Sequence, residues 1–173
     1  PKEKGSPACP PPGRWRRVHG QSRPGWWGSC GGYDTAVQEV VVNDAYYVDL
    51  TSTDTSNLYS YQSLQTVIAG GGVDVLGADE MVFENLAQSG AIADLTQYFS
   101  KDELEQLKDY IFYVEDKDTG DTFAAGIRLG AGSWPVEHGY YEKECILGIA
   151  LGSEHKESAE QMFRYLLEKS NLD

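Results

Sequence analysis

From residue 33 onward, short apolar runs alternate with stretches in which apolar residues recur at helical spacing. Residues 37–50 contain a run of β-branched and aromatic side chains, which predicts one bent strand or two strands divided at Asn43 and Asp44. The segment 51–57 that follows is polar. Apolar residues at positions 58, 61, 64, 67 and 68 then predict a helix that ends at the glycines 70–72.

The middle of the chain carries clear start signals for further elements. The apolar run 73–76 predicts a strand, and Asp79 is suited to cap a helix whose apolar residues share one face. Residues 92–95 predict a short extended piece. Ser100 and Glu103 have the spacing of a capping box and predict the start of another helix.

The last third of the sequence predicts a hairpin, a strand and a helix. Residues 110–115 and 122–129 are strand-like, and the turn residues between them predict a β-hairpin. Residues 145–151 form an apolar strand. Ser153 is suited to cap the terminal helix, which carries an apolar stripe over residues 159–167.

This alternation predicts the fold class. Helices between strands are typical of an α/β layer fold with a mixed, mostly parallel sheet flanked by helices, because crossover helices need a sheet face to cover. The length of 173 residues allows one such domain, which we place at residues 34–173.

Residues 1–33 differ sharply from this domain. They hold six of the seven prolines and six Lys or Arg against one Glu, whereas residues 34–173 hold eight Lys or Arg against 26 acids. We interpret residues 1–33 as a disordered Pro/Gly/Arg-rich tail, because such a segment buries too little apolar surface to order itself. Basic aromatic contact with nucleic acid and a polyproline ligand are alternatives, but the acidic domain would repel nucleic acid and we expect no such partner.

The motifs of common catalytic, metal and cofactor sites are missing from the sequence. The glycines 70–72 lack the Lys of a phosphate-binding loop, and the acidic turn at Asp116, Asp118 and Asp121 departs from the EF-hand pattern, which favours a solvated turn. The three histidines and three cysteines have no metal-ligand spacing. We therefore expect no catalysis, no cofactor and no metal.

A binding site remains possible by topology. In open α/β sheets, ligands lie outside the carboxyl ends of the strands. Three loops in that predicted position carry polar or stacking groups, at residues 51–57, 77–80 and 130–134. Trp134 is suited either to stack on a ligand or to plug the sheet end, and Asp79 favours the helix-cap role. The candidate ligand-binding residues are Thr51, Ser52, Asp54, Asp79, Glu80 and Trp134.

Two segments resemble one protein family. Residues 73–98 contain a strand ending in Asp, a helix and the run G-A-I-A-D-L-T. Residues 146–167 contain a strand and a helix and read I-L-G-I-A-L-G-S-E-H-K-E-S-A-E-Q-M-F-R-Y-L-L. Both are similar to segments of bacterial extracellular solute-binding proteins of ABC importers, of the type II periplasmic-binding-protein class. The resemblance implies a single such lobe, because only about 50 residues separate the segments, too few for a second α/β lobe.

The resemblance also implies a function and a location. It implies binding of a small solute such as a sugar, delivery to an ABC-transporter permease, and a place outside the cytoplasm at the cell surface. The run Trp27-Gly-Ser-Cys30 lacks the aliphatic residue of a lipobox, so we expect any membrane attachment to come from an anchor outside this sequence. The alternative is a non-catalytic interaction module, at the cell surface or beside a transporter, that has lost its ligand cleft.

Overall fold

The computed structural model describes residues 43, 46, 48–170 and 172, and all but the first belong to the unit Tyr46–Asp173. The unit is built on a four-stranded sheet in the order β1-β4-β3-β2. The strands are β1 (Val75–Ala78), β2 (Ile111–Glu115), β3 (Thr122–Leu129) and β4 (Cys145–Ile149). The predicted tail lies outside the described residues, as does the predicted strand region 37–50 apart from residues 43, 46 and 48–50.

The predicted mostly parallel sheet is wrong, because all three strand pairs are antiparallel. Val75 of β1 lies opposite Ile149 of β4, and Leu129 of β3 lies opposite Cys145 at the other end of β4. The two apolar runs of the sequence do lie side by side, but β4 runs opposite to both of its neighbours. The predicted fold class, a single periplasmic-binding-protein-like lobe with a mostly parallel sheet, is therefore also wrong.

The burial of β4 explains the error. All five of its residues are buried, so the strand is one continuous apolar run. Such a run is typical of a parallel strand covered on both faces. Here a central antiparallel strand is covered on both faces, which gives the same pattern.

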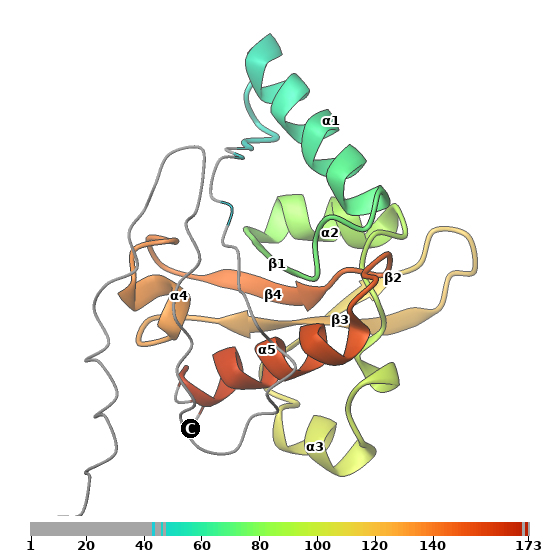
Figure 1. Ribbon diagram of the computed structural model, residues 1–173, viewed down its shortest axis with the longest axis vertical. Helices are drawn as coiled ribbons and strands as arrows, with labels where there is room; N and C mark the ends of the chain where they lie inside the picture. Colours follow the sequence, from blue (N-terminus) through green and yellow to red (C-terminus); the bar gives the residue numbers. More distant parts are fainter. Residues whose placement is uncertain (1–42, 44–45, 47, 171, 173) are drawn as a thin grey trace, which may run out of the picture. The chain divides into compact units, whose positions relative to one another are not determined.

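Helices cover the two faces of the sheet (Figure 1). On one face lie α1 (Thr55–Ala69) and α2 (Glu80–Gln88), and their buried residues form one cluster with Leu76, Val114 and Ile146. On the other face lie α5 (Lys156–Glu168) and the 3-10 helix η1 (Leu95–Gln97), which share a second cluster with the opposite sides of β3 and β4. The remaining helices are α3 (Lys101–Gln106) and α4 (Trp134–Glu137).

Two glycines let α2 approach the sheet. A Cβ atom on Gly126 or Gly148 would lie 2.7 or 2.6 Å from the Cζ atom of Phe83, closer than packed carbon atoms come. Phe83 of α2 is fully buried. The Phe83 ring therefore packs directly against the backbone of β3 and β4 at these two glycines.

Most of the local signals are confirmed. Asp79 caps α2 through its side chain, Ser100 and Glu103 form the capping box of α3, and β2 and β3 form the predicted hairpin. Asp54, which we predicted only as a ligand-binding residue, caps α1 in the same way. The predicted cap of α5 is wrong: the N-cap residue is His155. The Ser153 hydroxyl instead donates to the Asp74 carboxylate at 2.6 Å.

No helix within the described part of the chain has the length and apolarity needed to cross a membrane.

Candidate functional site

The six candidate residues fall into two groups. Asp79, Glu80 and Trp134 lie at the end of the sheet where β1 and β3 finish and β4 begins. The loop before α1 contains the other three, Thr51, Ser52 and Asp54. The far end of α1, not this loop, leads into β1 (Figure 1). The structure therefore describes two separate places rather than one binding site.

At the sheet end, the side chains of Asp79 and Glu80 both bind other residues of the domain. The Asp79 Oδ1 atom accepts from the backbone N–H of Val82 at 3.0 Å, as an N-cap does. Glu80 pairs with Arg128 of β3 at 2.8 Å, and Glu144 pairs with the same guanidinium at 3.1 Å. The guanidinium also lies over the ring of Phe112, with 5.2 Å between its central carbon and the ring centroid. This arrangement ties the start of α2 to the sheet.

The indole of Trp134 is also engaged. Its ring stacks with that of His138, with 4.3 Å between centroids, and with that of Tyr140, with 5.6 Å between centroids. The backbone N–H of Trp134 donates to the Ser170 hydroxyl at 3.2 Å. The side chain packs against the core cluster on the α5 face. This geometry matches the interpretation of Trp134 as a plug over the sheet end.

Two ionisable groups at this end are held neutral. Burial raises the pKa of the Tyr141 hydroxyl, which donates to the carbonyl of Gly77. Burial also raises the pKa of the Cys145 thiol to about 12. A thiol with so high a pKa has almost no thiolate at neutral pH, so Cys145 is a poor nucleophile.

The loop before α1 is ordered by its own side chains. The Oδ1 atom of Asp49 accepts from the N–H and the hydroxyl of Thr51 at 2.9 and 2.6 Å. Asn57 bridges back to the backbone of Asp49, and Asp54 Oδ1 accepts from the N–H of Ser56 at 3.0 Å. These hydrogen bonds favour the ionised carboxylates and lower the pKa values of Asp49 and Asp54.

A cavity of about 260 Å³ lies between this loop and the first turns of α1. All of its lining residues are polar: Asp49, Ser52, Asp54, Ser56, Asn57 and Ser60. Ser52 and Asp54 are predicted site residues, and Ser56 and Asn57 belong to the predicted polar loop 51–57 without being chosen from it. Asp49 and Ser60 were missed. The missed signal was the run of small polar residues through the first turns of α1, where Ser56 and Ser60 are four apart and share a face.

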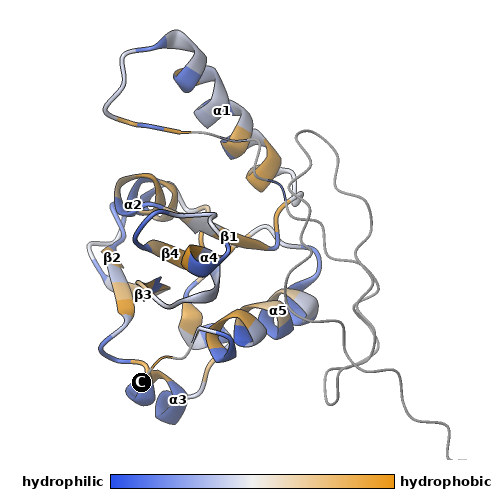
Figure 2. Cartoon of the chain, turned by 90° about the vertical axis from the view of Figure 1, so that its left-hand side faces the viewer, coloured by the Kyte–Doolittle hydropathy of each residue, from blue (hydrophilic) through white to orange (hydrophobic). Residues whose placement is uncertain are grey.

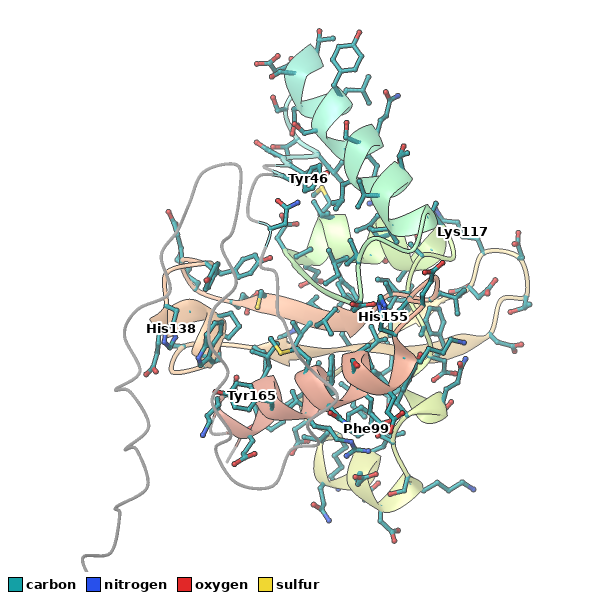
Figure 3. All side chains as sticks on the ribbon, in the orientation of Figure 1. Tyr46, Phe99, Lys117, His138, His155 and Tyr165 are labelled. Carbon is teal, nitrogen blue, oxygen red and sulfur yellow. The ribbon has the colours of Figure 1, made fainter. Side chains whose placement is uncertain are left out.

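The described residues hold no group of three or more His, Cys, Asp or Glu side chains placed to bind a metal ion. His138 and His155 lie near opposite ends of β4 (Figure 3). In the acidic turn, Asp116 Oδ1 accepts from the N–H groups of Asp118 and Thr119 at 2.8 and 3.1 Å. The turn thus has the hydrogen bonds of a closed Asx motif.

The comparisons with known proteins add no relative: no protein-family model, no curated protein and no solved structure matches the chain.

Proposed function

We propose that the domain is a non-catalytic binding module for a small polar solute, such as a sugar, held in the cavity between the loop at residue 49 and α1. The observation that carries this proposal is the lining of the cavity, in which six of six residues are polar. Serine hydroxyls both donate and accept hydrogen bonds, and ionised carboxylates accept them. That mixture complements the hydroxyl groups of a polyol.

Prior ordering of the site supports the proposal. The hydrogen bonds of Asp49, Asp54 and Asn57 fix the loop without a ligand, so the solute would bear less of the entropic cost of ordering it. The resemblance of two segments to solute-binding proteins supports the wider role. In that role the module lies outside the cytoplasm and delivers its solute to an ABC-importer permease.

Isothermal titration calorimetry with neutral mono- and disaccharides tests the proposal. Ser60→Leu places a branched apolar side chain in the cavity, and we expect it to weaken binding at least about tenfold by displacing solute and leaving its hydroxyls unpaired. Ser63→Leu is the matched control, because Ser63 lies on the same helix and does not line the cavity. The absence of heat with every saccharide, or equal loss in both variants, would contradict the proposal.

A second candidate function is a protein-interaction module. It is favoured by Leu58 and Tyr59 of α1, whose exposed fractions are 54% and 64%. Light scattering tests this alternative, because a surface that binds a second copy gives a mass that rises with concentration and falls in Leu58→Ser/Tyr59→Ser. A constant monomer mass at all concentrations argues against self-association through α1.

A further inference from the structure

The two edges of the sheet differ in how they are covered. The strand order makes β1 one edge and β2 the other. At β1, the hydroxyl of Tyr141 donates to the carbonyl of Gly77, so a side chain already occupies part of that edge. β2 lies at the outer edge of the domain (Figure 2). Within the described residues, β3 is the only strand that pairs with β2.

The hydrogen bonds at the two ends of β2 show which of its residues bond to β3. The carbonyl of Tyr110 accepts from the N–H of Arg128 at 2.7 Å, and the N–H of Asp116 donates to the carbonyl of Asp121 at 2.8 Å. Residues that bond to a neighbouring antiparallel strand alternate along the chain. The even-numbered residues 110–116 therefore face β3, and the odd-numbered residues of β2 face away from it.

The odd-numbered residues of β2 are open to a further strand. Tyr113 and Glu115 direct both backbone groups away from β3, and so does the Ile111 carbonyl, whereas the Ile111 N–H donates to the Leu107 carbonyl at 3.2 Å. The exposed fraction of Tyr113 is 55%, and Glu115 is also exposed. Edge strands are commonly protected from added strands by Lys or Pro, and β2 contains neither.

The surroundings of this edge are acidic. Residues 109–121 hold five Asp or Glu against one Lys, and the preceding Lys108 already pairs with Glu105 at 2.9 Å. A second copy of the domain would bring the same excess of negative charge to the edge, and like charges on paired strands are destabilising. Charge complementarity instead favours a strand that carries Lys or Arg.

We infer that the edge of β2 binds an extended basic segment of a partner protein, which adds to the sheet as a further antiparallel strand. One partner residue then lies opposite Tyr113, and the residue two before it lies opposite Glu115. An Arg at the first position stacks its guanidinium on the Tyr113 ring, and a Lys at the second pairs with the Glu115 carboxylate. Backbone hydrogen bonds hold the strand, and these two side chains select it. The inference is independent of the solute cavity at residue 49.

NMR titration of the 173-residue chain with synthetic peptides tests the inference. The probe is the acetylated and amidated peptide T-K-V-R-V-T-T, which places its Arg opposite Tyr113 and its Lys opposite Glu115. We expect saturable shifts of the Tyr113 and Glu115 amide signals. The acidic peptide T-E-V-E-V-T-T should bind at least about tenfold more weakly, because its charges face the acids of the edge. Equal affinity of the two peptides, or no saturable shift with the basic one, overturns the inference.

Methylation of single peptide nitrogens tests the strand pairing itself. An N-methyl group on the Arg of the probe removes the N–H that donates to the Tyr113 carbonyl, and we expect binding to weaken at least about tenfold. An N-methyl group on the Val after that Arg lies on the far side of the added strand and should keep binding within about threefold. Equal loss with both methylated peptides would show binding through charge alone and would overturn the inference.

Charge reversal at the edge supplies the last arm. We expect Glu115→Lys to weaken binding of the basic peptide at least about tenfold. Glu154→Lys is the matched control, because Glu154 is exposed and its side chain lies beside Gly71, which precedes β1 at the opposite edge. Equal loss in both variants would show a general effect of charge and would overturn the assigned edge. Shifts of the Tyr113 amide on raising the protein concentration without peptide would show a second copy at β2 and would also overturn the inference.

Discussion

The two longest helices contact the sheet in different ways. On α5, a stripe of Ala159, Phe163, Leu166 and Leu167 is buried. On α1, only Leu64 and Ile68 are buried, and both belong to the second half of the helix. Figure 2 shows the same contrast, because the hydrophobic residues of α1 gather at its end near β1 while its first turns are hydrophilic.

Polar contacts repeat the contrast. Arg164 of α5 pairs with Glu160 at 2.9 Å and Glu103 at 2.6 Å, donates to the Tyr98 carbonyl at 2.9 Å, and stacks over Phe99. The polar groups at the start of α1 instead bond within their own loop. The comparison teaches that α5 holds the fold together, whereas the first turns of α1 contribute no buried side chain to the core.

Truncation of a buried side chain on α5 is the strongest way to break this comparison. Phe163 is fully buried and meets Phe99 edge-on, with 5.7 Å between ring centroids. We expect Phe163→Ala to lower the free energy of unfolding by about 3–5 kcal/mol, because it removes apolar contacts and leaves a cavity. Leu58→Ala on α1 should change it by less than about 0.5 kcal/mol. Urea unfolding measures both, and similar losses would contradict the assigned roles.

The next largest effect on stability is expected where Phe83 packs against Gly126 and Gly148 on the other face of the sheet. Gly148→Ala puts a methyl group 2.6 Å from the Phe83 Cζ atom, and we expect a loss of about 1–3 kcal/mol from overpacking. Phe83→Leu in the same chain should recover part of that loss by shortening the side chain. Gly130→Ala is the control, since a Cβ atom there meets nothing within 4 Å. Equal stability of Gly148→Ala and Gly130→Ala in thermal melts would show that the ring is not seated on bare backbone.

The Arg164 contacts predict a dependence of stability on pH. Hydrogen bonds from Arg164 and then Ser100 lower the pKa of Glu103 from its ordinary 4.5 to about 2. A carboxylate with a lowered folded-state pKa stabilises the fold above its ordinary pKa, and that contribution is lost as the pH falls from 4.5 toward 2. The side chain of Glu103 is 40% exposed, so solvent screening reduces the contribution to about 1 kcal/mol.

The variant Glu103→Gln measures this contribution in urea unfolding. Its stability deficit relative to the unsubstituted chain should be present at neutral pH and should shrink as the pH falls through 4.5. Glu105→Gln is matched on the same helix, where the pair with Lys108 is exposed and contributes little. A deficit that is constant with pH would show that the Glu103 carboxylate is not the titrating group.

Most local signals in the sequence were informative, although the cap predicted at Ser153 was wrong because its hydroxyl bonds to Asp74. The caps at Asp79 and Ser100 and the hairpin 111–129 depend on residues a few positions apart, and the stripe of α5 follows helical period. Sheet order was not readable, because β4 has the same apolar run in either orientation. Its neighbour is set by long-range pairs such as Val75 with Ile149.

The candidate site divides along the same line. Ser52 and Asp54 were readable because they follow an expected strand, and Ser56 and Asn57 lie in the same predicted polar loop. Ser60 was missed because only the apolar residues of the following helix were considered. The stacking of Trp134 with His138 has helical spacing of four and was open to prediction. The stacking of Trp134 with Tyr140 could not be predicted in this way, because it depends on the turn after α4.

The smallest expected effect on stability comes from removing the helix caps, which compares the start of α1 with the start of α2. Asp79→Ala removes the cap of α2, whose Val82, Phe83, Leu86 and Ala87 are buried, and we expect a global loss of about 1 kcal/mol. Asp54→Ala removes the same kind of cap from α1, where the first two turns contribute no buried residue. We therefore expect a smaller global loss and faster amide hydrogen exchange confined to the first turns of α1, because local opening there costs little buried surface. Urea unfolding and exchange measured by NMR separate the two variants. Faster exchange throughout α1 and the sheet in Asp54→Ala would show instead that the start of α1 is as firmly coupled to the core as α2.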